Sequence, residues 1–144
     1  GEIGAGTTVT ALYEITPAGS GAELVDPLRY GQPGGAAPAV PASDEIGFLK
    51  MRYKAPEGTT SQLIETPITP ALEVATLAAA SEDARWAAAV AAFAQKLKGS
   101  SYGGTMSYDE IKALAQGARG ADENGYRAEF IQLINSAQMA DPGH

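Results

Sequence analysis

Residues 81–99 read SEDARWAAAVAAFAQKLKG, a stretch that carries both start and stop signals for a helix. Ser81 is a suitable N-cap, and the two acids after it suit the positive end of a helix dipole. Lysines near the other end and Gly99 favour termination there. Interspersed alanines allow neighbouring elements to approach closely. The spacing of larger residues predicts one apolar face, made of Trp86, Val90, Phe93 and Leu97.

Two further helices are predicted downstream. Ser107 and Glu110 have the spacing of a capping box, and Gly117 or Gly120 is expected to end that helix. Its expected apolar face consists of Ile111, Leu114 and Ala115. The third helix is predicted over residues 124–139. Its expected apolar stripe consists of Tyr126, Phe130, Leu133, Ile134 and Ala137.

Strand patterns occupy much of the first half of the chain. Residues 7–15, TTVTALYEI, alternate at period two and are rich in β-formers, so they predict a first strand. Residues 46–55, IGFLKMRYKA, predict a second strand, and residues 61–66, SQLIET, predict a third. The turn sequence PEGT between them indicates an antiparallel hairpin. On the second strand, one expected face carries Leu49, Met51 and Tyr53, and the solvated face carries Phe48, Lys50, Arg52 and Lys54.

The predicted elements combine into an α+β domain. Residues 17–43 are rich in proline and glycine, which predicts a solvated, flexible connection between the first two strands. We expect one domain over residues 1–144, with a β-rich part at 1–70 and a three-helix part at 81–140. Its small antiparallel sheet, of about three strands, is expected to pack with the C-terminal three-helix unit.

The composition argues against several classes of function. The chain has no cysteine, and its one histidine is the last residue, His144, so thiol or imidazole catalysis and Cys/His metal sites are disfavoured. The net charge of −7 argues against a nucleic-acid interface. No apolar run is long enough to span a membrane. Gly4 and Gly6 precede a strand pattern instead of following one, so they do not form a dinucleotide fingerprint. We expect no catalytic, cofactor-binding or metal-binding residues, and no cofactor.

Acidic pairs and aromatic residues allow other interpretations. Acidic pairs occur at residues 44–45, 82–83, 109–110 and 122–123. The last three lie near predicted helix starts, where the helix dipole accounts for them without catalysis. Trp86 is expected in the core. One alternative function is a small-ligand or glycan site lined by Tyr30, Tyr53 and Tyr102. A carboxylate-dependent hydrolase is a weaker alternative.

Several stretches in order resemble a known family. They are GAGTTVTALYEITP, LKMRYKAPEGTTSQLIETPI, RWAAAVAAFAQKLKGSSYGG and SYDEIKALAQGARGADENGYRAEFIQLINSA. Together they resemble the C-terminal region of bacterial von Willebrand factor type A domain proteins of the YfbK type, over nearly the whole chain except residues 17–43. The resemblance implies an upstream type A domain, whose metal-ion-dependent adhesion site opens with D-x-S-x-S. This chain lacks that pattern, so the metal site is not carried over.

The resemblance also sets the functional expectation. It implies a non-catalytic accessory module that supports protein–protein interaction, in a cell-envelope or extracytoplasmic protein, with the upstream type A domain as a partner. The chain begins with Gly1 and no Met, so we expect a piece of a longer protein. A small sheet leaves an edge unpaired, and residues 7–15 lack the proline and lysine that guard edges. We therefore expect pairing with upstream strands or, in their absence, a homodimer through a sheet edge.

Overall fold

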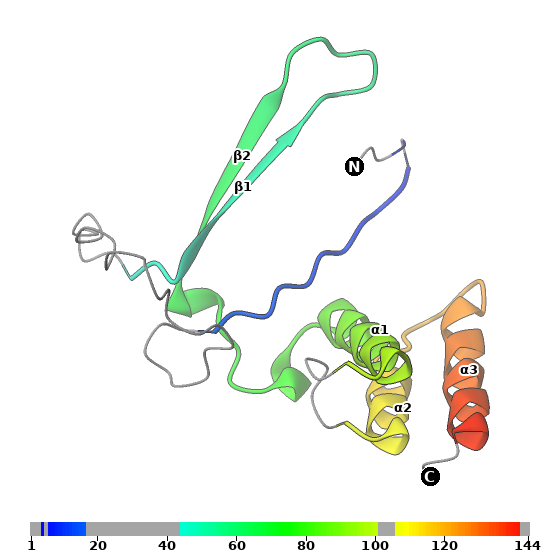
Figure 1. Cartoon of the computed structure of the whole chain (residues 1–144). Coiled ribbons are helices and arrows are strands. Elements are labelled where there is room, and N and C mark those ends of the chain that lie inside the picture. Colours follow the sequence, from blue (N-terminus) through cyan, green and yellow to red (C-terminus); the bar gives the residue numbers. More distant parts are fainter. Residues whose placement is uncertain (1–3, 5, 17–43, 101–105, 142–144) are drawn as a thin grey trace, which may run out of the picture. The chain divides into compact units, whose positions relative to one another are not determined.

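The computed structural model describes residues 4, 6–16, 44–100 and 106–141 (Figure 1). Within them the chain forms an antiparallel pair of strands followed by helices, which confirms the predicted α+β class. One compact unit contains the hairpin and another contains the three α-helices. The predicted linker at 17–43 lies outside the described residues. The elements in order are β1 Gly47–Tyr53, β2 Gln62–Ile68, the 3-10 turns η1 Pro70–Leu72 and η2 Leu77–Ala79, α1 Glu82–Lys98, α2 Tyr108–Gly117 and α3 Tyr126–Ala140.

The β1–β2 hairpin confirms the predicted pairing of the second and third strands. Lys50 lies opposite Glu65, and Met51 lies opposite Ile64. Because side chains directly opposite each other share a face, this register divides the hairpin into two faces. The apolar hairpin face carries Leu49, Met51, Tyr53, Ile64 and Ile68, together with Gln62 and Thr66. The charged hairpin face consists of Phe48, Lys50, Arg52, Leu63, Glu65 and Pro67.

The predicted first strand, residues 7–15, is wrong. In the described structure residues 7–16 have no regular secondary structure, and the sheet has two strands instead of about three. The large apolar side chains of this segment stay exposed, with Val9 at 66% and Tyr13 at 78%. A strand pattern becomes a strand only when a neighbour satisfies its backbone, and here β1 is paired only with β2.

The helix ends follow their sequence signals. The backbone N–H of Ala84 donates to the Ser81 hydroxyl at 3.3 Å, and α1 ends at Gly99 with φ of 64°. At the start of α2, the Ser107 hydroxyl accepts from the Glu110 N–H, and the Glu110 carboxylate accepts from the Ser107 N–H at 2.7 Å. Both predicted caps are confirmed, because each satisfies backbone groups that the helix leaves free.

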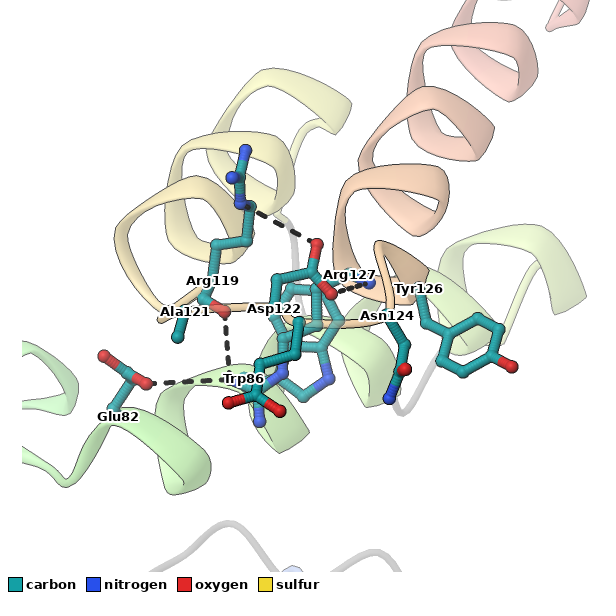
Figure 2. A pocket seen from close by; sticks show the side chains of 9 residues that line it. Glu82, Trp86, Arg119, Ala121, Asp122, Asn124, Tyr126 and Arg127 are labelled. Carbon is teal, nitrogen blue, oxygen red and sulfur yellow. Dashed lines mark hydrogen bonds and ion pairs between the residues drawn. The ribbon is translucent and has the colours of Figure 1, made fainter.

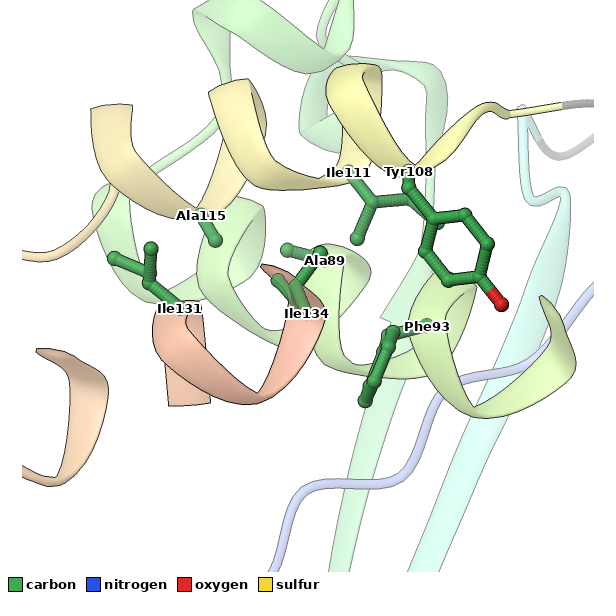
Figure 3. Packing of buried hydrophobic residues seen from close by; sticks show 7 residues of the cluster. All are labelled: Ala89, Phe93, Tyr108, Ile111, Ala115, Ile131 and Ile134. Atoms are coloured by element: carbon green, nitrogen blue, oxygen red, sulfur yellow. The ribbon is translucent and has the colours of Figure 1, made fainter. Parts of the chain in front are cut away.

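The core of the helical unit is small and is made by all three helices (Figure 3). Its buried residues are Ala89 and Phe93 of α1, Tyr108, Ile111 and Ala115 of α2, and Ile131 and Ile134 of α3. Three ring pairs meet edge to face: Trp86 with Phe130 at 5.2 Å, Phe93 with Phe130 at 5.4 Å, and Phe93 with Tyr108 at 6.4 Å between centroids. The rings thus link α1 with both other helices.

The predicted apolar faces of α1 and α3 are partly wrong. Four residues assigned to them are exposed: Val90 at 39%, Leu97 at 57%, Tyr126 at 72% and Leu133 at 54%. On α1 the buried face is centred on Ala89, which is fully buried, because its small side chain allows a neighbouring helix to approach. On α3 the fully buried position is Ile134, with Ile131 one turn earlier.

Candidate functional site

Acidic and basic side chains meet where the α2–α3 loop lies beside the start of α1 (Figure 2). They surround an open cavity of about 530 Å³, which we call the charged hollow. All of its lining residues belong to the helical unit. They are Glu82, Trp86, Arg119, Ala121, Asp122, Glu123, Asn124, Tyr126 and Arg127.

Arg127 is the centre of the charged hollow. Its guanidinium lies 4.8 Å from the ring centre of Trp86, a cation–π distance. It also forms ion pairs with Asp83 at 2.8 Å and Glu82 at 3.7 Å. The same group donates to the backbone carbonyl of Ala118 at 2.9 Å. Arg127 therefore joins the first turns of α1 and α3 to the end of α2.

Asp122 caps α3 from the preceding loop. Its two carboxylate oxygens accept from the backbone N–H groups of Arg127 at 2.9 Å and Ala128 at 2.8 Å. Burial acts to raise the pKa of this carboxyl, since its side chain is 4% exposed. The two N–H donors and the charges of Arg119 and Arg127 outweigh burial and hold the pKa below its ordinary value. Asp122 is therefore ionised at neutral pH.

At Gly120 the loop lies beside the Glu82 side chain of α1. This residue has φ of 61°, and a Cβ built there would require the Glu82 carboxylate to shift. The positive φ favours glycine at this position. The sequence predicted Gly120 as a possible helix end, but its contact with α1 depends on tertiary structure.

Several carboxylates of the helical unit form structural contacts. Glu110 is held by Ser107, and the backbone and hydroxyl hydrogen bonds from Ser107 keep the pKa of Glu110 below its ordinary value. Asp109 accepts from the Gln138 amide at 3.3 Å. Together with the contacts of residues 82, 83 and 122, these bonds match the helix-start role predicted for three acidic pairs. Among the described residues, no group of three or more His, Cys, Asp or Glu side chains is placed to hold a metal ion.

Of the three tyrosines predicted to line a ligand pocket, the structure describes Tyr53. Tyr53 lies on the apolar hairpin face, where its hydroxyl donates to Gln62 at 2.7 Å. Tyr30 and Tyr102 lie outside the described residues, as does His144. Trp86 is partly buried against the core and packs on Phe130, as predicted for a core aromatic.

A second candidate site is the apolar hairpin face, which is uncovered. Leu49, Met51 and Tyr53 are 44–49% exposed, and Ile64 is 39% exposed. Exposed apolar side chains that adjoin on one face are typical of protein interaction surfaces. The sequence predicted that the three β1 residues share a face, but not that this face is bare, because burial depends on what lies above it.

Comparison with known proteins gives one family. A family model described as "Uncharacterized protein YfbK, C-terminal" matches residues 1–140. A curated relative, "Uncharacterized protein YfbK" of Escherichia coli (strain K12), is 47% identical over 137 residues. The match covers 95% of this chain but 23% of the relative, so the chain spans about a quarter of that protein's length. No solved structure matches.

Proposed function

Because this chain belongs to the family of YfbK C-terminal regions, we propose that it is a non-catalytic accessory module that supports protein–protein interaction. Its first partner is the region that precedes the matched segment in the longer protein. The resemblance to von Willebrand factor type A domain proteins supports the proposal that this region is a type A domain. The same resemblance supports a location in the cell envelope, which fractionation of cells that express the longer protein tests directly.

One observation carries the proposal: large apolar side chains are exposed in both units. In the hairpin unit they form the apolar hairpin face, and in the helical unit they include Leu97, Tyr126, Leu133 and Met139, which are 54–82% exposed. Single exposed apolar residues are ordinary on protein surfaces. An adjoining set on a two-stranded sheet is not, because an isolated two-stranded hairpin is only marginally stable in water. Covering this surface with a partner supplies the missing apolar burial.

The alternatives have less support. The charged hollow contains acids and arginines that are already paired with one another or with backbone groups, which leaves little for substrate chemistry. A glycan site needs aromatic side chains that line one groove, and Tyr53 is bonded to its own hairpin neighbour. None of the helices in the described ranges combines the length and hydropathy needed to cross a bilayer. An accessory role requires only surface complementarity.

The test uses a longer polypeptide in which a protease site separates the preceding region from this chain. After cleavage without denaturant, we expect the two pieces to elute together in gel filtration. Separate elution at micromolar concentration would contradict the proposal. In parallel, calorimetric titration of this chain with Mg²⁺, Mn²⁺ and Zn²⁺ should show no one-to-one binding tighter than about micromolar.

A further inference from the structure

The two faces of the β1–β2 hairpin differ in the charges and contacts of their side chains. On the charged face, Lys50 pairs with Glu65 at 3.1 Å, directly across the strands. The Lys50 ammonium also lies 5.3 Å from the ring centre of Phe48, so it partly covers this apolar side chain. Phe48 and Leu63 on this face are 47% and 41% exposed, but its three charged side chains suit it to remain in water.

The apolar face has little such compensation. Within the described residues, its side chains form a hydrogen bond from Tyr53 to Gln62, at the turn end of the ladder. Leu49, Met51 and Ile64 have apolar side chains that stay 39–49% exposed. An amphipathic sheet with one charged face and one exposed apolar face is the arrangement expected when a second layer packs on the apolar side.

We propose that the apolar hairpin face is the surface on which the preceding region of the longer protein docks. This inference rests on the proposed function and names its contact surface. The occupant is an apolar surface of that region, in the same polypeptide. The curated relative has more than three quarters of its length outside the match, and the matching family is described as C-terminal. The preceding region therefore has the size for such a layer, and its attachment gives it a high effective concentration.

The chain's lack of cysteine allows a direct test with single thiols. Met51→Cys places a thiol on the apolar hairpin face, and Arg52→Cys places a matched control on the opposite face one residue later. Each variant is prepared in this chain and in the longer polypeptide, and the rate of maleimide labelling is read by peptide mass spectrometry. Docking is expected to slow labelling at Met51→Cys at least about tenfold in the longer polypeptide, while Arg52→Cys labels at the same rate in both.

Equal labelling of Met51→Cys in both contexts would overturn the inference. Ile64→Cys, on the same face but on β2, repeats the test if the first variant does not fold. Leu133→Cys, on α3, distinguishes failure of this inference from failure of the proposed function. If only Leu133→Cys is protected and the cleaved pieces still co-elute, the preceding region binds another surface: the proposed function holds, and this inference is wrong. Met51→Cys could also label slowly in this chain alone, together with a doubled mass in light scattering. That result would show that a second copy covers the face, and it would overturn the proposed occupant.

Discussion

Asp122 and Arg127 determine how the helical unit is held at one end. Asp122 satisfies two N–H groups that α3 would otherwise leave free, and Arg127 stacks on Trp86 while it pairs with the acids that begin α1. Each interaction is modest alone, because most of the partners are solvent-accessible. Their combination holds α1, the α2–α3 loop and α3 together at one place.

Replacing Asp122 by alanine should lower the midpoint of thermal unfolding by roughly 4–8 °C at neutral pH, because the cap of α3 is lost. The fluorescence of Trp86, the chain's one tryptophan, reports the transition. The matched control is Glu123→Ala, an exposed acid beside it, which should leave the midpoint nearly unchanged. An equal loss in both variants would contradict the capping role.

The same stabilisation should depend on pH. The folded state lowers the pKa of Asp122, so ionised Asp122 favours folding. Its contribution is complete above the carboxyl's unfolded value, near 4, and is lost as the pH falls through the lowered folded value. The difference in unfolding midpoint between the natural chain and Asp122→Ala should therefore shrink below about pH 4. A difference that grows on acidification would show that the sign is wrong.

Two glycines close together in sequence should respond oppositely to alanine. Gly120→Ala places a Cβ at positive φ and requires the flexible Glu82 carboxylate to shift, so we expect a loss of about 1–2 kcal/mol in unfolding free energy, mainly from the backbone conformation. Gly117 lies in α2 with open space around its Cβ position, so Gly117→Ala should gain about 0.5–1 kcal/mol. Urea unfolding of the two variants measures both, and a gain at Gly120 would contradict the positive φ of this residue.

At the scale of elements, the sequence predicted helix ends better than helix faces. The caps at Ser81 and Ser107 are local, so the neighbouring residues in the sequence are enough to predict them. Faces depend on the packing neighbour: Phe93 belongs both to the predicted stripe with Val90 and Leu97 and to the buried stripe with Ala89, and both stripes fit an apolar helix. The alanine-rich stripe is buried, because small side chains let helices pack closely.

The choice between those two stripes is testable. Phe93→Ala should reduce the unfolding free energy by about 3–5 kcal/mol, since Phe93 is 4% exposed and packs on Phe130 and Tyr108. Val90→Ala, one turn earlier, should change it by less than about 0.5 kcal/mol, because that side chain is exposed. Urea unfolding followed by helical circular dichroism compares them. A loss at Val90 as large as that at Phe93 would show that Val90 is buried, as the sequence predicted.

The prediction of strands from sequence depends even more on which neighbour is present. The hairpin was predictable because its turn and both strands are contiguous in sequence, and the register keeps the expected face of Leu49, Met51 and Tyr53. Residues 7–15 have an equally good strand pattern but no ladder partner among the described elements. The charged hollow was not predictable as a site, since Arg127 reaches residues more than forty positions away.

At the scale of the whole molecule, the chain combines a small helical core with a hairpin that buries little. The largest fully buried side chains are Ile111 and Ile134, both in the helical unit. In the hairpin, most strand residues are exposed, so its stability in isolation rests on few apolar contacts. We therefore expect the hairpin to gain stability beside the protein surface that we propose covers it.

Amide hydrogen exchange of β1 and β2 tests this account most directly. It is measured on this chain alone and on the longer polypeptide that carries the preceding region, with the amides of α2 as an internal reference. We predict that amides of residues 47–53 and 62–68 exchange at least about tenfold more slowly in the longer polypeptide, while those of α2 change little. Equal hairpin exchange in the two contexts would show that the preceding region does not cover the hairpin, and would contradict the account.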